Sequence, residues 1–337
     1  MIYPEFIKKG DAVAVTALSA GSECEMDKIR LNLAKERFGK MGFNVIETPN
    51  CYTNICGRSS SAETRGKEFN SVIENNDAKA IILLAGGEFL VESLSNIDFD
   101  LIKKFPKWIQ GYSDPTGILY SVTTNLDIAT LYGENFRSFA MDPMHKSLEN
   151  DLSILSGEGI IQESFDLYED EWREYVTGKE EFELTKPVKW INLNEEKVID
   201  LSGRIIGGCL DILLFIIGTK YDGTLKFIEK YKNDGIIWYF DNCELSSEDI
   251  IRAMWKMKEL GFFKYTKGII WGRTGIEKSC KDISFQEAIK QSLSDLNVPI
   301  ILEADIGHKP PRMTIINGAI THINSSNGKG SISFELR

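Results

Sequence analysis

The sequence predicts an α/β protein of two lobes: a flavodoxin- or Rossmann-like N-terminal lobe with a parallel sheet, and a smaller C-terminal α/β lobe with a mixed sheet. Short apolar runs alternate with longer amphipathic segments over the first ~135 residues and again after Gly203, a pattern typical of βαβ units. The 337 residues also exceed the roughly 100–200 residues of one domain. We expect an N-terminal lobe over 1–150, a connector over 151–200 and a C-terminal lobe over 201–337.

In the first lobe, apolar runs predict strands and helically spaced apolar residues predict helices. Glu25–Met41 has such spacing and is followed by Gly42, a suitable C-cap. The pattern Ser60-x-x-Glu63 predicts the capping box of a helix that ends near Asn76. The expected strands are Ala12–Leu18, Phe43–Glu47, Ala78–Leu84, Trp108–Gln110 and Ile128–Tyr132.

The connector is polar and rich in Glu, Lys and Trp, so we expect either a substrate loop or a plain linker there. In the second lobe, Ser246-x-x-Asp249 predicts the start of a helix that ends at Gly261. The other expected elements are a helix over Leu210–Ile217, strands over Gly235–Phe240, Gly268–Trp271 and Pro299–Glu303, and closing antiparallel strands over Thr314–Asn317 and Ser331–Leu336.

The composition excludes several classes of function. With 39 Lys+Arg against 50 Asp+Glu, the net charge of −11 argues against a nucleic-acid partner. No apolar stretch reaches the ~18–20 residues that cross a bilayer, and the N-terminus lacks the features of a secretory signal. The six cysteines form no C-x-x-C and no metal-site spacing with a histidine. We therefore expect reduced thiols in the cytoplasm, no metal and no membrane association.

Two segments of the first lobe follow expected strands, where α/β proteins bind ligands. Gly111-Tyr-Ser-Asp lies between a strand and a helix with Pro115 near its start, as in a nucleophile elbow. Ser113 is a candidate nucleophile, and the alternative is a simple helix cap. Gly86 and Gly87 either free backbone N–H groups for an oxyanion or form only a tight turn. The sequence has no G-x-G-x-x-G and no P-loop lysine, so no nucleotide cofactor is expected.

The second lobe supplies an acid and a histidine. Asp241 and Glu244 follow the strand Gly235–Phe240, where a carboxylate can orient a histidine or cap the next helix. Of the three histidines, His145 and His322 lie in a charged connector and an alternating strand, and only His308 follows an expected strand. A serine, an acid and a histidine at strand ends form a set suited to nucleophilic catalysis.

These segments, in this order, resemble the LD-carboxypeptidase family of serine peptidases, which includes the microcin C immunity proteins. The resemblance covers nearly the whole chain. It implies that Ser113 is the nucleophile, that His308 is the general base, and that N–H groups of Gly86 (or Gly87) and Asp114 form the oxyanion hole. The segments that carry it are Ile7-Lys-Lys-Gly-Asp-Ala-Val-Ala-Val, Gly86-Gly87, Gly111-Tyr-Ser-Asp, Arg204-Ile-Ile-Gly-Gly and Gly307-His308.

Two positions depart from the family pattern. The family usually has glutamate where this chain has Asp241, so we expect Asp241 to be the triad acid, with Glu244 as its rival. Cys209 stands where the family often has asparagine, and we expect it to be a small buried residue rather than a nucleophile.

The resemblance implies an amide hydrolase that needs no cofactor and works in the cytoplasm as a homodimer. Its substrate is then either a muropeptide that loses a terminal D-amino acid in cell-wall recycling, or an acyl-nucleotide amide. The length of the connector favours the immunity-like branch. We expect Glu88 to bind substrate because it lies beside the glycines, at a position where recognition differs between family members. We expect the same of Trp172 and Trp190, because indole rings can stack on a purine, although both tryptophans equally suit packing. A two-lobed binding protein without catalysis is the alternative class.

Overall fold

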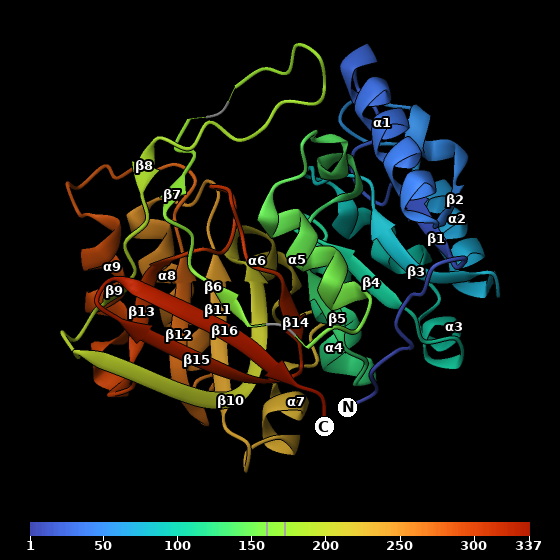
Figure 1. The fold of residues 1–337 in the computed structure, drawn as a ribbon. Coiled ribbons are helices and arrows are strands. Elements are labelled where there is room, and N and C mark those ends of the chain that lie inside the picture. The colour runs from blue at the N-terminus through green and yellow to red at the C-terminus, as the bar shows by residue number, and fades with distance from the viewer. Residues whose placement is uncertain (160, 172) are drawn as a thin grey trace. The chain divides into compact units, whose positions relative to one another are not determined.

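The computed structural model describes residues 1–159, 161–171 and 173–337. The chain divides into two compact units, which we call the first unit and the second unit (Figure 1). Neither contains, among these residues, a helix with the length and apolar content to span a membrane. The first unit comprises Met1–Ile160, Glu171–Phe182 and Thr314–Asn317, and the second comprises Ile161–Asp170, Glu183–Met313 and Gly318–Arg337.

The first unit is built on a six-stranded sheet in the order β14-β5-β4-β3-β1-β2. Strands β1 to β5 are parallel, and their order 2-1-3-4-5 is that of flavodoxin, which confirms the expected fold. The strands are β1 (Ala12–Thr16), β2 (Asn44–Glu47), β3 (Ala78–Leu83), β4 (Trp108–Gly111), β5 (Thr130–Tyr132) and β14 (Ile315–Asn317).

Helices connect these parallel strands, as crossovers in a parallel sheet require. Helix α1 ends at the expected glycine, because Gly42 adopts φ 92°. Helix α2 starts one residue later than predicted: the Oγ of Ser61, not Ser60, accepts a hydrogen bond from Thr64 N. The helices are α1 (Glu25–Met41), α2 (Ala62–Glu74), α3 (Phe99–Lys104), α4 (Thr116–Leu126) and α5 (Lys146–Leu155), with 3₁₀ turns at Pro49–Tyr52, Leu90–Asn96 and Phe136–Ala140.

Strand β14 corrects one expectation. We predicted Thr314–Asn317 as a closing strand of the second lobe, but β14 pairs antiparallel with β5 in the sheet of the first unit. Asn317 Nδ2 donates to Thr130 Oγ1 at 3.2 Å, and Thr314 Oγ1 donates to Asp151 Oδ2 at 2.8 Å. A short apolar run predicts a strand, but it carries no information on which of two sheets the strand joins.

The second unit contains an eight-stranded mixed sheet in the order β6-β16-β15-β10-β11-β12-β13-β9. Strands β10 to β13 are parallel, and each flanking strand is antiparallel to the strand it pairs with on the side of this core, so the mixed sheet is confirmed. The strands are β6 (Gln162–Glu163), β9 (Ile191–Asn192), β10 (Val198–Cys209), β11 (Ile236–Asp241), β12 (Thr266–Gly272), β13 (Ile300–Ala304), β15 (Ile320–Ser326) and β16 (Lys329–Glu335).

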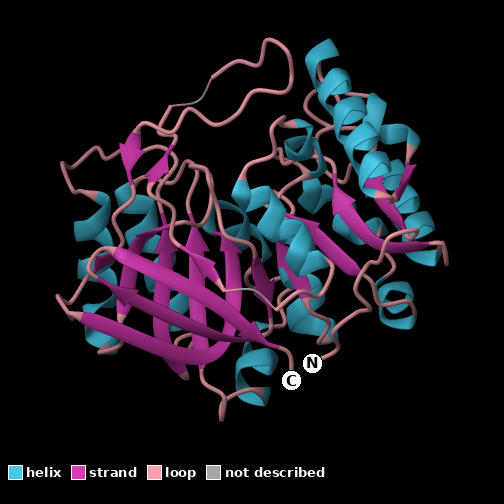
Figure 2. Ribbon diagram, viewed as in Figure 1, coloured by secondary structure: helices cyan, strands magenta, loops and turns pink. Residues whose placement is uncertain are grey.

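The remaining elements of the second unit include a small two-stranded sheet of β7 (Leu167–Tyr168) and β8 (Lys186–Pro187). Figure 2 shows helices beside the strands in this unit, as in the first. These helices are α6 (Leu210–Ile216), α7 (Thr224–Lys230), α8 (Ser247–Glu259) and α9 (Phe285–Leu293), followed by a 3₁₀ turn at Ser294–Leu296.

Strand β11 shows how the sequence places a polar group inside the second unit. All six residues of Ile236–Asp241 are buried, because the strand lies between β10 and β12 and central parallel strands are covered on both faces. Trp238 stacks on Phe240, with ring centroids 5.8 Å apart. The strand has one charged residue, Asp241, at its carboxyl end.

Candidate active site

Ser113 lies in the turn between β4 and α4 with a left-handed backbone, φ 69°. Non-glycine residues seldom adopt this conformation, and a strained strand-to-helix turn is the geometry of a nucleophile elbow. Asn135 holds the turn: its Oδ1 accepts from Tyr112 N at 3.2 Å, and its Nδ2 donates to Tyr112 O at 3.3 Å. The Ser113 N–H donates to Tyr132 Oη at 3.3 Å. The structure thus gives the predicted elbow, with a partly exposed serine.

Gly111 opens this turn for a steric reason. A Cβ added there would lie 2.8 Å from Pro115 Cβ and 2.9 Å from Asn135 Oδ1. Any side chain would therefore displace the asparagine that fixes Tyr112. The glycine in Gly111-Tyr-Ser-Asp is therefore needed so that Pro115 and Asn135 can pack against the backbone of the turn.

The glycine turn after β3 lies beside the serine. A Cβ added to Gly86 would lie 3.3 Å from Ser113 Oγ, and one added to Gly87 would lie 2.4 Å from Ser19 Oγ. The backbone N–H groups of Gly86, Gly87 and Asp114 donate to no acceptor among the described residues. These N–H groups are available to stabilise an oxyanion.

The carboxylate of Asp114 has a structural role that its sequence position does not reveal. It is fully buried and accepts hydrogen bonds from Ser19 Oγ and, at 2.9 Å, from Leu90 N. Burial raises the pKa of Asp114 to about 6, while the two hydrogen bonds oppose that rise. The side chain links the elbow to the segment after β1 and to the segment after the glycine turn, so it holds together the chain segments that follow three strands.

Arg65 reinforces the same region from α2. Its Nη1 donates to Leu18 O and to Phe89 O, both at 2.9 Å, and its Nη2 pairs with Glu92 at 2.8 Å. The side chain is fully buried, so these bonds satisfy a charge that burial would otherwise disfavour. Sequence analysis missed Arg65, because a polar residue in a helix predicts exposure unless its partners are known.

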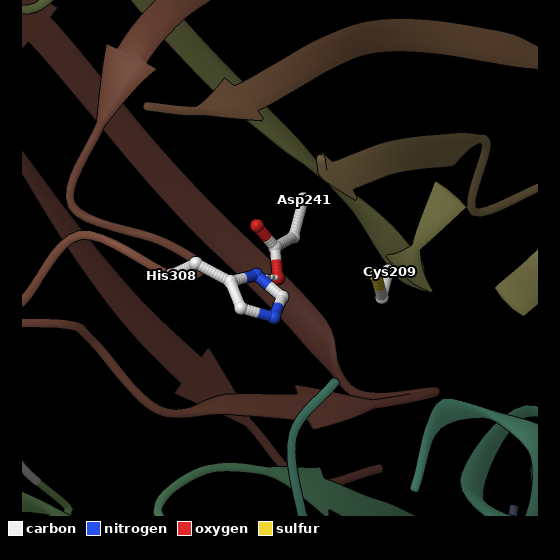
Figure 3. Close-up of side chains that lie close together, drawn as sticks. All are labelled: Cys209, Asp241 and His308. Carbon is white, nitrogen blue, oxygen red and sulfur yellow. Dashed lines mark ion pairs between the residues drawn. The ribbon is translucent and has the colours of Figure 1, made fainter. Parts of the chain in front are cut away.

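In the second unit, His308 and Asp241 form a buried pair. His308 Nδ1 lies 2.7 Å from Asp241 Oδ2, and the side chains are 4 % and 0 % exposed (Figure 3). Burial alone would lower the pKa of His308, but the Asp241 carboxylate raises it well above its ordinary value. Glu244 is exposed, and its backbone N–H donates to Asp211 Oδ1 at 2.8 Å. Of the two candidate acids, the structure brings Asp241 to the histidine.

Gly307 makes this pair sterically possible. It has φ 93°, and a Cβ added to it would lie 2.0 Å from Asp241 Oδ1. Only glycine allows both this backbone conformation and the close approach of the carboxylate. This explains why glycine precedes the histidine in this chain.

The loop that carries His308 is fixed by a buried ion pair that sequence analysis did not predict. Arg273, directly after β12, pairs with Asp305, directly after β13, at 2.7 Å. Arg273 Nη2 also donates to Lys309 O at 3.0 Å and to Pro311 O at 3.1 Å. These carbonyls follow the histidine, so the guanidinium holds the loop around it. The strand-end rule that found Asp241 would also have found Arg273.

The three predicted substrate-binding residues differ in what the structure says of them. Trp190 is 2 % exposed, and its Nε1 donates to Asp305 Oδ2 at 2.9 Å. A ring this buried presents little surface to a purine, which favours the packing alternative. Trp172 lies outside the described residues. Glu88 is exposed next to the glycine turn and stays a candidate.

The Cys209 side chain lies close to the acid–histidine pair (Figure 3). It ends β10 and is the register partner of Asp241 on β11. Burial raises the pKa of its thiol well above the ordinary value, and the nearby carboxylates of Asp241 and Asp211 raise it further. A protonated, buried thiol is a poor nucleophile, which agrees with the expectation for this residue.

Both halves of the chain match models of one family. Residues 13–133 match the LD-carboxypeptidase N-terminal domain, and residues 202–323 match the LD-carboxypeptidase C-terminal domain. The chain belongs to the LD-carboxypeptidase family. It is therefore a hydrolase of the serine peptidase type. Ser113 lies in the first matched region, and Asp241 and His308 lie in the second.

Two curated relatives match over most of their length. A putative carboxypeptidase of Treponema pallidum is 24 % identical over 324 residues, covering 94 % of this chain and 91 % of the relative. The microcin C7 self-immunity protein MccF of Escherichia coli is 24 % identical over 348 residues, covering 96 % of this chain and 93 % of the relative.

Solved structures share the fold. An MccF-like protein from Bacillus anthracis has a TM-score of 0.84 at 26 % identity and covers all of both chains. MccF in complex with aspartyl sulfamoyl adenosine has a TM-score of 0.80 at 22 % identity, covering 100 % of this chain and 99 % of that one. A muramoyltetrapeptide carboxypeptidase from Oxalobacter formigenes has a TM-score of 0.73 at 18 % identity, covering 96 % and 99 %.

Proposed function

We propose that this protein hydrolyses an amide bond with Ser113 as nucleophile, His308 as general base and Asp241 as the acid that orients the histidine. The observation that carries this role assignment is the buried contact of 2.7 Å between His308 Nδ1 and Asp241 Oδ2. In the proposal the Nδ1–H faces the carboxylate, which leaves the lone pair of the neutral ring on Nε2. That nitrogen can take a proton from a hydroxyl group.

In the proposed reaction, Ser113 Oγ attacks the carbonyl carbon while His308 Nε2 accepts the serine proton. The backbone N–H groups of Gly86 and Asp114 stabilise the oxyanion, and loss of one such donor typically costs about 3–4 kcal/mol of transition-state stabilisation. His308 then passes its proton to the leaving nitrogen, and water hydrolyses the acyl-enzyme. The reaction requires the Ser113 hydroxyl to come within hydrogen-bond reach of Nε2.

We propose an acyl-nucleotide amide, of the type aminoacyl-sulfamoyl adenosine, as the substrate class. The fold agrees better with the MccF-like structure, at a TM-score of 0.84, than with the muramoyltetrapeptide carboxypeptidase, at 0.73. The printed ligand of one MccF structure is aspartyl sulfamoyl adenosine. The second candidate is a muropeptide, supported by the carboxypeptidase names of the curated relatives.

Incubation with an aminoacyl-sulfamoyl adenosine and, separately, with an L,D-tetrapeptide muropeptide, with products identified by mass, separates these candidates. We expect cleavage of the first by the wild-type chain and none by Ser113→Ala. Ser121→Ala is the matched control, because that buried hydroxyl only donates to Gly117 O within α4. Cleavage of the muropeptide alone would favour the second candidate, and cleavage of neither would favour a binding protein.

Hydrolysis retained by Ser113→Ala would refute the nucleophile. We further propose, on the resemblance to the family, that the protein acts as a homodimer in the cytoplasm. Light scattering on the purified chain tests the dimer, and cell fractionation tests the compartment.

A further inference from the structure

Three metal-binding side chains meet at the carboxyl ends of strands in the second unit. Cys209 ends β10, Asp241 ends β11, and His308 lies in the loop after β13. A sulfur, a carboxylate oxygen and a ring nitrogen from the three all lie within 4.8 Å of one another, and all three residues are buried (Figure 3). The residues are far apart in the sequence, so no spacing motif reveals the cluster.

We propose that this cluster binds a thiophilic divalent cation such as Zn²⁺ and that the bound ion inhibits the enzyme. Zinc takes thiolate, imidazole and carboxylate ligands at about 2.0–2.3 Å, which places ligand atoms roughly 3.3–3.6 Å apart around a tetrahedral ion. The observed spread of 4.8 Å or less comes close to that geometry, so small side-chain movements suffice. The fourth position is left to water.

The charges around the cluster favour a cation. Asp241 is fully buried, and Asp211 lies beside the thiol, with its Oδ2 3.4 Å from Cys209 Sγ. Two carboxylates and one thiolate more than balance the charge of a divalent ion, which is the usual way that a buried charge is tolerated. Metal binding would release the Cys209 proton to solvent, and no electron is transferred.

Inhibition follows from the ring nitrogen of His308 to which the ion binds. His308 Nδ1 lies 2.7 Å from Asp241 Oδ2, so we place the ion on Nδ1, where it replaces the ring proton that faces the carboxylate. The two atoms then move apart by about 0.6 Å to the spacing of zinc ligands. The remaining ring proton then resides on Nε2, which has no lone pair to accept the serine proton. This step rests on the proposed function, whereas binding of the ion does not.

A cobalt titration tests binding without any assay of activity. Cys24, Cys56 and Cys280 are exposed, so the titration uses a background chain in which all three are serine. We expect Co²⁺ to give a thiolate-to-cobalt charge-transfer band, and Zn²⁺ to remove it. The band should be lost in Cys209→Ser, or in Cys209→Ala if the serine variant does not fold. It should persist in the control Cys51→Ser, whose buried thiol lies in the first unit.

Absence of the band from the background chain, or its persistence in both Cys209 variants, would overturn the site. The activity test then follows. Zn²⁺ should inhibit hydrolysis by the background chain reversibly with EDTA, Mg²⁺ should not, and Cys209→Ser should require at least 10-fold more Zn²⁺. Cobalt binding without inhibition by Zn²⁺ would overturn the inhibitory role. If the chain hydrolyses neither test substrate, the spectrum still decides the site, so the two proposals fail separately.

Discussion

The two strand-end regions, one in each unit, offer different chemical groups for the proposed reaction. In the first unit the proposed active groups are a strained, partly exposed serine and the N–H groups of glycines. In the second unit they are the buried side chains Asp241 and His308. A nucleophile and its oxyanion donors must meet the substrate, whereas a carboxylate–imidazole bond is stronger away from water. The carboxyl ends of the strands thus present a hydroxyl and backbone N–H groups in one unit and two titratable side chains in the other.

The largest expected effect tests the charged pair. Asp241→Asn should lower kcat by about 10⁴-fold, because an amide no longer holds the tautomer with its lone pair on Nε2. Glu244→Gln is the matched control and should stay within about twofold, since that carboxylate is exposed. Steady-state kinetics on both variants measures the difference. A large loss in Glu244→Gln with little change in Asp241→Asn would reverse the choice of acid.

The next effect separates steric demand from backbone strain. Gly307→Ala and Gly218→Ala both force a side chain onto a left-handed residue, at φ 93° and 88°, which costs of order 1–3 kcal/mol of stability. Only Gly307→Ala also places its Cβ 2.0 Å from Asp241 Oδ1, whereas the space at Gly218 is empty. We expect a further loss of about 100-fold in kcat for Gly307→Ala alone.

Equal kinetic losses in these two variants would show that Gly307 serves only the backbone. Urea unfolding of both variants gives the stability term, and kcat measured well below the midpoint of unfolding gives the catalytic term.

A smaller effect tests the glycine turn of the first unit. The Cβ of Gly86→Ala would lie 3.2 Å from Ser113 Cβ and 3.3 Å from its Oγ, so the neighbours must shift by only a few tenths of an ångström. We expect about a 10-fold fall in kcat, since small misplacement of a donor or nucleophile weakens catalysis. Unchanged kcat would mean that this turn has no part in stabilising the oxyanion.

The pH profile sharpens the role of the carboxylate. The proposed mechanism needs neutral His308, so kcat/KM should rise with pH through the pKa of His308, which Asp241 holds above the ordinary value of 6.5. In Asp241→Asn the carboxylate charge is gone while burial and the contact with Cys243 remain, so the limb should move to lower pH. The ion pair stabilises the fold below the unfolded pKa of histidine and is lost as pH rises through the folded pKa. A limb that does not move contradicts this coupling.

The smallest effect concerns Trp190. Trp190→Phe keeps an aromatic ring but removes the bond from Nε1 to Asp305. A hydrogen bond to a charged group contributes about 1.5–3 kcal/mol, so we expect that loss in urea unfolding and no change in KM. A rise in KM for the nucleotide amide, without loss of stability, would restore the stacking role.

The sequence predicts most of the strands and helices, because apolar runs and helix caps are local signals. It predicts Ser113, Asp241 and His308 because each follows an apolar run. It does not predict the ion pair between Arg273 and Asp305, since both partners are strand-end residues whose pairing depends on the sheet order. Nor does it assign β14 to the first unit, because β14 pairs with β5, far away in the sequence. The residues of neither strand indicate that partner.

The connector illustrates the same limit. Residues 151–200 have no strong periodicity, yet Glu171–Phe182 packs in the first unit while Ile161–Asp170 and Glu183 onward belong to the second. In the first unit, Arg30 lies over the ring of Tyr175, 3.6 Å from its centroid. Such contacts depend on partners far away in the chain, which periodicity does not register.

Mapping of the acylated residue tests the central claim most directly. The chain is mixed with excess aminoacyl-sulfamoyl adenosine, quenched in acid within the first turnover, digested and sequenced by mass spectrometry. If Ser113 is the nucleophile and His308 with Asp241 its base, the acyl group is found on Ser113 and is absent from Ser113→Ala. An acyl group on Cys209, which lies beside the same histidine and acid, would contradict the assignment and make the enzyme a cysteine hydrolase.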